Sequence, residues 1–544
     1  MAPTIVTEYL SDWRVLAGSC SLALVLYHLV PYALDTHRLR GYPGPFLAKF
    51  SDFWLALLSR GGHRSEKVHE LHEKYGPFVR IAPNHLSIAH PDALQTVYAH
   101  GNGALKSDFY DAFVAIHRGL FNTRDRAEHT RKRKIVSHIF SQKSVNEFEP
   151  HVRLYVEQLM GRWDAMHDLA LKGGSGDEGD GGWTGHDGRL WLDLLPWSNY
   201  LAFDIIGDLA FGAPFGMILS GADAAQIPKR PDEALGKYGG DHSEIETIAV
   251  PAVRTINGRG EYSMTMGCIP PRWRPAVKRV LPEFRRGAAD VQALSGIAIM
   301  AVAKRLATPT DRNDLLSKLQ AAKDEKGQPL GAAELTAEAL TLLIAGSDTT
   351  SNSTCAIIYY LARSSATQAR LQQELDEALG ADAAEKVTFY EQVKKLPYLD
   401  AVINEALRLH STSALGLPRI VPAGGMTVMG QFFPEGTVLS VPSYTLHRDE
   451  DVWGEDAEDF RPERWFERDQ AQLQRTFNPF SIGPRACVGK NLATLELQII
   501  ISSLLRRYHF VLENPDMELP TREGFLRKPL TCKVGIKRRD DVLL

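Results

Sequence analysis

The sequence predicts a mainly α-helical body with small β-sheets, preceded by one N-terminal apolar helix. Residues 334–361 carry apolar side chains nearly all round a helix, a pattern typical of a helix buried on every side. Residues 398–409 show a shorter amphipathic pattern, which Pro397 opens and a serine and threonine cluster ends. Strand-like patterns are confined to the short segments 78–87, 437–441 and 530–537.

The composition allows a large core and excludes one broad class of partner. The chain has 544 residues, of which 44% are hydrophobic, and its formal net charge is −4. A dedicated nucleic-acid-binding protein would be markedly basic, so nucleic acid is not an expected partner. The five cysteines are scattered and form no CxxC pair, which is typical of a protein from a reducing compartment.

An apolar segment at residues 15–34 predicts a single membrane anchor, because a helix of this length covers a hydrocarbon core of about 30 Å. A cleaved signal peptide is the alternative, but it would need a basic start, whereas Glu8 and Asp12 precede the segment. Basic residues follow the segment, so the positive-inside rule places the rest of the chain in the cytosol. We therefore expect an anchor with its basic flank at residues 1–40 and one catalytic domain at residues 41–544.

Two segments are predicted to be surface loops or insertions without regular structure. Residues 172–188 are rich in glycine and aspartate and contain too little apolar area to order themselves. Residues 221–244 mix proline, glycine, lysine and aspartate and predict another irregular connection. Between them, residues 191–215 are apolar and predict a buried helix.

The strongest chemical signal is a glycine-rich loop around Cys487. Residues 480–489 read FSIGPRACVG and open a predicted helix at residues 490–505. Glycines can let the backbone turn tightly beside a flat macrocycle, and Arg485 offers a permanent cation. The alternative is a buried free cysteine in a loop.

This run resembles the haem-binding loop of the cytochromes P450. By that resemblance Cys487 is the proximal ligand to iron, where a thiolate favours cleavage of an O–O bond. The resemblance also places Phe480, Gly483 and Arg485 at the haem.

The predicted central helix contains polar residues that burial does not explain. Residues 345–350 read AGSDTT, and glycine in a helix interior costs about 1 kcal/mol relative to alanine. Thr349 can donate a hydrogen bond to the carbonyl of Ala345 and so open the helix locally. A packed serine and threonine cluster is the alternative interpretation. The pattern resembles that of the cytochromes P450, which implies that Asp348 relays protons and Thr349 hydrogen-bonds the oxygen being reduced.

Glu405 and Arg408 lie one turn apart on a predicted helix, and an isolated surface pair of this kind contributes only about 0.2–0.5 kcal/mol. Residues 460–465 read FRPERW, and the P450 family joins a Glu-x-x-Arg pair to the arginine of such a Pro-Glu-Arg turn. The resemblance therefore assigns a structural role to Glu405, Arg408 and Arg464.

A basic stretch at residues 129–134 reads HTRKRK, and its simplest interpretation is a solvated cationic face or a nucleic-acid patch. The family resemblance instead places His129 and Arg133, four residues apart, against a haem propionate, with Arg419 as a further propionate ligand. Arg131, Lys132 and Lys134 are then expected to face solvent and to steer an acidic electron-transfer partner.

Several longer stretches are similar to the fungal benzoate 4-monooxygenases. These stretches are residues 105–113, 116–134, 201–216, 411–419 and 521–529. The resemblance implies hydroxylation of benzoate para to its carboxylate, in the catabolism of aromatic compounds, with haem b, dioxygen and NADPH. The electrons would arrive through NADPH–cytochrome P450 reductase, or through cytochrome b5, at the endoplasmic reticulum membrane.

A small flat acid requires a narrow apolar slot and one polar anchor. The residues predicted for the slot are Tyr110, Phe113, Leu343, Ala345 and Ala414. The residues predicted for the anchor are Ser411, Thr412, Ser413, Lys106 and Arg118. Three other functions remain open: a P450 hydroxylase of another small aromatic or aliphatic acid, a reductase-independent haem-thiolate isomerase or dehydratase, and a haem-based sensor.

Overall fold

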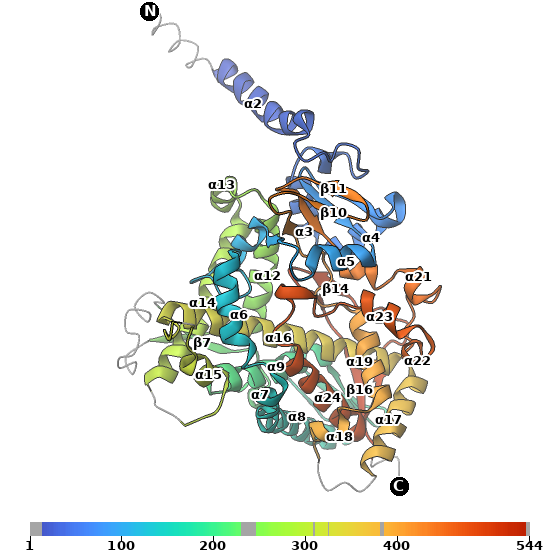
Figure 1. The fold of residues 1–544 in the computed structure, drawn as a ribbon. Helices are drawn as coiled ribbons and strands as arrows, with labels where there is room; N and C mark the ends of the chain where they lie inside the picture. The colour runs from blue at the N-terminus through green and yellow to red at the C-terminus, as the bar shows by residue number, and fades with distance from the viewer. Residues whose placement is uncertain (1–12, 230–245, 308–310, 325, 381–385, 540–544) are drawn as a thin grey trace, which may run out of the picture.

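The computed structural model describes residues 13–229, 246–307, 311–324, 326–380 and 386–539. Its first helix, α2 (Trp13–Leu34), projects away from the body of the protein (Figure 1). The mean hydropathy over Arg14–Leu34 reaches 1.6 and this part of the helix is not buried, so it is long and apolar enough to cross a membrane. Tyr27 connects α2 to the body, because its hydroxyl accepts a hydrogen bond from Trp273 at 3.0 Å.

The body is built around one long helix, α16 (Ala332–Arg363), which confirms the central helix predicted at residues 334–361. It packs against α9 (Leu194–Phe211), α14 (Pro282–Ala307), α19 (Pro397–Leu409) and α24 (Lys490–Arg507). The helices predicted at residues 191–215, 398–409 and 490–505 are α9, α19 and α24.

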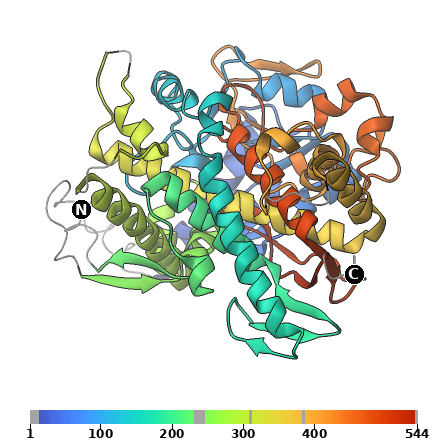
Figure 2. The same cartoon turned by 90° about the horizontal axis from the view of Figure 1, so that it is seen from below.

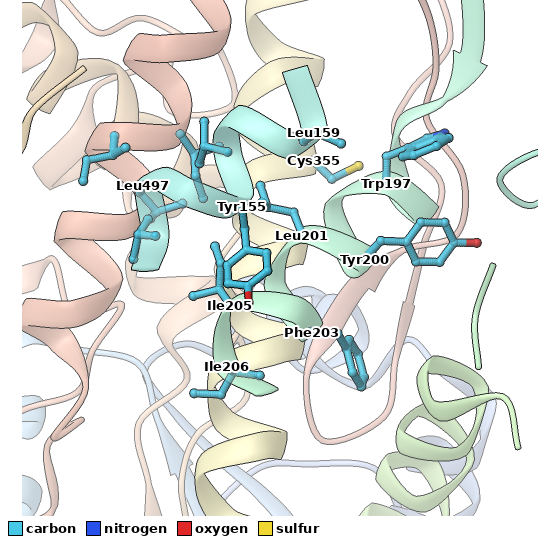
Figure 3. Packing of buried hydrophobic residues seen from close by; sticks show 14 of the residues in the cluster. Tyr155, Leu159, Trp197, Tyr200, Leu201, Phe203, Ile205, Ile206, Cys355 and Leu497 are labelled. Atoms are coloured by element: carbon cyan, nitrogen blue, oxygen red, sulfur yellow. The ribbon is translucent and has the colours of Figure 1, made fainter. Parts of the chain in front are cut away.

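The main hydrophobic core lies where α9 and α16 meet α8 (Glu149–Ala170) and α24 (Figure 3). Leu159, Leu201, Ile205, Cys355 and Leu497 come from these four helices, and each side chain is at most 2% exposed. Nearly every residue of α9 is buried, Asp204 and Asp208 included, so this helix is enclosed on every face.

Shorter helices surround this core. In the first half of the chain they are α3 (Phe53–Gly61), α4 (Arg64–Tyr75), α5 (Pro91–Tyr98), α6 (Arg126–Ser137), α7 (Gln142–Asn146), α10 (Met217–Ser220) and α12 (Ala252–Cys268). In the second half they are α13 (Arg274–Val280), α15 (Leu315–Ala321), α17 (Ser365–Leu379), α18 (Tyr390–Val393), α20 (Ser443–Leu446), α21 (Glu450–Trp453), α22 (Arg464–Glu467) and α23 (Gln470–Thr476). Short 3-10 helices form η1 (Leu47–Lys49), η2 (Asp108–Phe113) and η3 (Gly483–Arg485).

The strands form small sheets, as the sequence predicts. One sheet has the order β1 (Phe78–Ala82), β2 (His85–Ile88), β12 (Val438–Ser440), β9 (Arg419–Ile420), β3 (Leu105–Lys106). Another has the order β13 (Tyr508–Leu512), β16 (Lys533–Arg538), β6 (Arg189–Asp193), β5 (Trp183–His186), β4 (Ser175–Gly176). Three hairpins pair β10 (Met426–Val428) with β11 (Gln431–Phe433), β14 (Thr521–Glu523) with β15 (Arg527–Pro529), and β7 (Ala225–Pro228) with β8 (Thr247–Val250).

The prediction of an irregular loop at residues 172–188 was wrong. This segment contains β4 and β5, which pair with each other, and β5 also pairs with β6, beside the end of α8 (Figure 2). Trp183 is only 4% exposed, and its indole N–H donates to the carboxylate of Glu178 at 2.7 Å. One buried aromatic side chain therefore packs this segment against the body, which the glycine-rich composition did not indicate.

Two other predictions were incomplete. The single strand predicted at residues 78–87 is a hairpin, because the chain turns at Pro83 and Asn84 between β1 and β2. In the loop predicted at residues 221–244, residues 225–228 form β7, whereas residues 230–244 lie outside the described part of the chain.

Candidate active site

The Cys487 loop is held between α5 and α24. The backbone N–H of Cys487 donates to the carbonyl of Phe480 at 2.8 Å and closes the loop. Gly483 has a φ of 74°, and a Cβ atom there would lie 1.9 Å from the carbonyl oxygen of Tyr98 in α5. Only glycine fits this position, because any other side chain would push the loop away from α5.

The thiol of Cys487 faces an internal space. Its side chain is exposed, yet burial by the surrounding protein raises the pKa of the thiol. Backbone N–H groups of Gly489 and Lys490 and the charge of Arg133 act against this rise and favour the thiolate. A cysteine on the outer surface would not combine accessible area with such desolvation.

The middle of α16 also borders an internal space. Ala345 is exposed although Ser347 and Asp348 are buried. Thr350 of α16 donates to the carboxylate of Glu496 in α24 at 2.7 Å, so α16 is joined to the helix that directly follows Cys487. We infer that the accessible surfaces of Ala345 and Cys487 belong to one enclosed site between these two helices.

Thr349 lies on the same side of α16 as Ala345, one turn further along. Its hydroxyl donates to the carbonyl of Ala345 at 2.6 Å, the hydrogen bond expected from the sequence. The expected local opening of the helix is not seen, because α16 is continuous from Ala332 to Arg363. The accessible surface at Ala345 results from missing side-chain neighbours rather than from a broken helix.

Four cations and a histidine gather near the Cys487 loop. Arg133 of α6 donates to the carbonyl of Ala486 at 2.7 Å, and Arg485 donates to the carbonyl of Thr123 at 2.6 Å. Arg419 donates to the hydroxyl of Tyr110 at 2.9 Å. The ammonium of Lys106 is the fourth cation and contacts the carbonyl of Phe121, and His129 is the histidine.

This cluster has an excess of positive charge. Burial, together with the charges of Arg485, Lys106, Arg133 and Arg419, lowers the pKa of His129 to about 3. Within the described residues no carboxylate forms a salt bridge with any of these four cations. Buried positive charge without a counter-charge is costly, so the cluster fits a ligand that carries acidic groups.

Glu405, Arg408 and Arg464 form a fully buried ion-pair network. Glu405 accepts from Arg408 at 2.8 Å and from Arg464 at 2.7 Å, and all three side chains are inaccessible to solvent. Arg464 also reaches Asp456 at 2.9 Å. The network ties α19 to the segment around α22, on the chain just before the Cys487 loop.

Asp348 is buried, and burial raises the pKa of its carboxyl. The charges of Lys528 in β15 and Arg259 in α12 act in the opposite direction. Asp348 therefore faces α12 and the β14–β15 hairpin, whereas its neighbour Thr349 lies on the side of Ala345.

The residues predicted for a substrate slot do not all lie in one part of the structure. Tyr110 and Phe113 of η2 belong to an aromatic cluster with Phe109, against which Phe121 and Phe525 pack. The fully buried Leu343 lies in the main core, and two residues along a helix place it nearly opposite Ala345. The structure therefore does not bring Leu343 to the Ala345 side.

The remaining slot and anchor residues follow α19. Ala414 is fully buried, Thr412 is 8% exposed, and Ser413 is half-buried. The hydroxyl of Thr412 is buried without a hydrogen-bond partner, and that of Ser411 pairs with His447 at 2.6 Å.

The predicted solvent-facing basic patch on α6 was wrong for one residue. Lys132 is 1% exposed, and its ammonium lies 2.8 Å from Glu334 of α16. Arg131 is half-buried and pairs with Glu128 at 2.7 Å, so Lys134 is the exposed member of the three.

Sequence reasoning missed several buried charges of the site. Glu496 is the one acid in α24 and lies between Leu495 and Leu497, and a lone acid between two leucines was a signal that could have identified it. Burial raises the pKa of Glu496 to about 7. Arg259 and Lys528 gave no comparable signal, because their partner Asp348 is distant in the sequence.

A family model for cytochrome P450 matches residues 43–536. The chain belongs to the cytochrome P450 family. Benzoate 4-monooxygenase bphA of Aspergillus niger is 50% identical over 95% of this chain and 96% of its own length. Cytochrome P450 monooxygenase gsfF of Penicillium aethiopicum is 29% identical over 96% of this chain, and hepC of Aspergillus oryzae is 30% identical over 92%.

The P450 family and these relatives make the protein a monooxygenase, and the family implies a haem with a thiolate-ligated iron. The residues present fit that group. Cys487 offers a thiol to an internal space, Ala345 leaves room on the facing helix, and the unbalanced cations suit the two haem propionates.

Proposed function

We propose that this P450 hydroxylates benzoate at the ring position para to its carboxylate, using dioxygen and electrons from NADPH. The observation that carries the proposal is the 50% identity to benzoate 4-monooxygenase bphA over nearly the full length of both chains. The aromatic cluster of η2 supports it, because it supplies flat apolar surroundings for one benzene ring.

In this proposal Cys487 binds the haem iron through its thiolate, which Gly489 and Lys490 stabilise with backbone N–H groups. The haem propionates are bound by Arg133, Arg419, Arg485, Lys106 and His129. Phe480 and Gly483 shape the loop at the haem edge, since the Phe480 carbonyl closes it and Gly483 lets it approach α5. The bound haem supplies the oxidising chemistry that an unactivated aromatic C–H bond requires.

Two residues of α16 are proposed to manage protons. The Thr349 hydroxyl donates to the Ala345 carbonyl, which leaves its oxygen free to accept a hydrogen bond on the open side of the helix. The pKa of Asp348 is raised by burial, so its carboxyl holds a proton more readily than an exposed aspartate. Asp348 is therefore suited to hold a proton close to Thr349 in the chain, but its carboxyl faces Lys528 and Arg259, so transfer of that proton to Thr349 is not direct.

The remaining proposals concern location and electron supply. Residues 1–40 would anchor the protein in the endoplasmic reticulum membrane by α2, with residues 41–544 as one catalytic domain in the cytosol. A cytochrome P450 reductase, or cytochrome b5, would dock near the exposed Lys134 and Lys490, which lie on the Cys487 side of the protein.

The test is turnover of the purified full-length protein with a P450 reductase, NADPH and benzoate. The expected product is 4-hydroxybenzoate, and no product should form when NADPH is omitted. Formation of 2- or 3-hydroxybenzoate would reject the para position, and the absence of any hydroxybenzoate would reject the substrate.

A further inference from the structure

Arg259 of α12 is a buried cation with most of its hydrogen-bonding capacity unused. Its side chain is 8% exposed, and it donates to the carbonyl of Phe113 at 3.1 Å. Within the described residues the structure records no other hydrogen bond and no salt bridge for this guanidinium. An arginine has five N–H donors, so one neutral carbonyl leaves both charge and donors available to a ligand.

The charges around Arg259 do not cancel. Asp348 is the acid whose charge acts on Arg259, but the charge of Lys528 affects the pKa of Asp348 more than the charge of Arg259 does. Glu261, on the same helix, forms its own salt bridge with Arg522 at 2.9 Å. The charge of Glu261 also acts on Lys528, so two carboxylates, Asp348 and Glu261, serve three cations. One positive charge is left in excess.

Arg259 lies beside the aromatic cluster that we propose as the substrate site. Its guanidinium carbon is 5.4 Å from the centre of the Phe113 ring, and that ring is 4.9 Å from the ring of Phe525. A Cβ atom on Gly260 would lie 4.0 Å from the backbone nitrogen of Phe525, so α12 touches the turn between β14 and β15. Cation and aromatic walls come together where α12, η2 and this turn meet.

Ser263 adds a second unused polar group. It lies one turn after Arg259 on the same side of α12, it is fully buried, and its hydroxyl has no hydrogen-bond partner. A buried hydroxyl without a partner is costly, so its presence beside an unbalanced cation points to a ligand with acceptor atoms.

Three of the anchors predicted from the sequence are less suitable. Arg118 is 43% exposed and pairs with Asp111 at 2.8 Å. Lys106 belongs to the cation cluster assigned to the propionates. The Ser411 hydroxyl is already paired with His447.

We propose that Arg259 binds the carboxylate of the aromatic acid substrate, with the Ser263 hydroxyl as an additional donor. This inference rests on the proposed function. In benzoate the para carbon is the ring atom farthest from the carboxylate. With the carboxylate held by Arg259 on α12 and the ring directed toward Cys487, the para carbon would be the atom presented for oxidation.

The test compares benzoate with benzamide, a neutral ligand of nearly the same shape, on the full-length ferric holoenzyme. Affinities are measured from the spectral shift that accompanies displacement of iron-bound water. Loss of a hydrogen-bonded charge is expected to weaken benzoate binding by about 10- to 150-fold in Arg259→Gln and to leave benzamide binding unchanged. Arg259→Lys, which keeps the charge, should lose less.

Arg254→Gln is the matched control, because Arg254 is an exposed arginine on the same helix, and both affinities should match the wild type. Haem loading is checked by the absorption of the reduced carbon monoxide complex, and should Arg259→Gln fail to load, the benzoate-to-benzamide ratio of Arg259→Lys decides. If Arg259→Gln weakens the binding of both ligands equally, or does not weaken benzoate binding, Arg259 is not the anchor. The proposed function is not affected by that result. A wild type that does not respond to benzoate rejects the proposed substrate, and the anchor with it.

Discussion

Glu405→Gln tests whether the buried network of Glu405, Arg408 and Arg464 holds the fold together. The carboxylate of Glu405 accepts two hydrogen bonds from Arg408, at 2.8 and 2.9 Å, and one from Arg464 at 2.7 Å. It also accepts from the backbone N–H of Arg461 and from the indole of Trp465, both at 3.1 Å. Glutamine keeps the shape, but it replaces one of the two accepting oxygens by a donor and removes the negative charge.

The fewest hydrogen bonds are lost when the amide nitrogen replaces the oxygen that accepts from Arg408 Nε and from Trp465. Even then, these two donors lose their acceptor. Arg464 keeps the carboxylate of Asp456 as a charged partner at 2.9 Å, whereas Arg408 keeps only neutral acceptors, the remaining side-chain oxygen and backbone carbonyls. Removing one partner from a buried ion pair costs about 3–5 kcal/mol. We expect the free energy of unfolding to fall by about that amount.

The control is Glu463→Gln, two positions beyond Arg461. Glu463 pairs with Arg370 at 2.7 Å, but the two side chains are 29% and 54% exposed, and such a pair contributes about 0–1 kcal/mol. Both variants are unfolded in urea as full-length holoenzyme and followed by circular dichroism. A Glu405→Gln loss no larger than that of Glu463→Gln would refute the reasoning.

Three further outcomes are expected. Cys487→Ser should abolish the thiolate-type absorption of the reduced carbon monoxide complex, and a persisting band would contradict the proposed iron ligand. Thr349→Ala should uncouple the enzyme, so that NADPH is consumed and peroxide released with little hydroxylated product, and normal coupling would contradict its role in proton delivery. Burial raises the pKa of Glu496 to about 7 from an ordinary value near 4.5. Between these pH values the folded state holds a proton that the unfolded state releases, so the free energy of unfolding falls as the pH rises. Glu496→Gln should remove this loss, so its stability relative to the wild type should increase from pH 5 to pH 7, and a pH-independent difference would contradict the assignment.

The parts of the site that are local in the sequence could be predicted from it. The hydrogen bond from Thr349 to Ala345 follows from their spacing of four residues in one helix. The cysteine loop is likewise continuous, so its residues 480–489 are fixed together by one turn. Sequence patterns describe such neighbours directly, because the chain itself holds them in register.

Features that depend on distant contacts could not be predicted. Lys132 looks like a surface cation, but Glu334 and Glu338, some two hundred positions later, compensate its charge and allow it to be buried. Trp183 orders a glycine-rich segment that composition alone classifies as a loop. Asp348 faces Lys528, which lies 180 positions later in the sequence, so its orientation could not be predicted from neighbouring residues.

The distribution of positive charge separates cofactor binding from substrate binding. The pKa of Lys106 is lowered by burial and by Arg419, Arg485 and Arg133, whereas the charge that acts on Arg259 is that of Asp348. The charges that act on Lys106 and on Arg259 therefore do not overlap, and we expect the two groups of cations to bind separate anions. It follows that Lys106→Met should weaken haem retention without changing the preference for benzoate over benzamide, while Arg259→Gln should change that preference without loosening the haem. If Lys106→Met and Arg259→Gln each changed both haem retention and the preference for benzoate, the two sites would form one electrostatic unit.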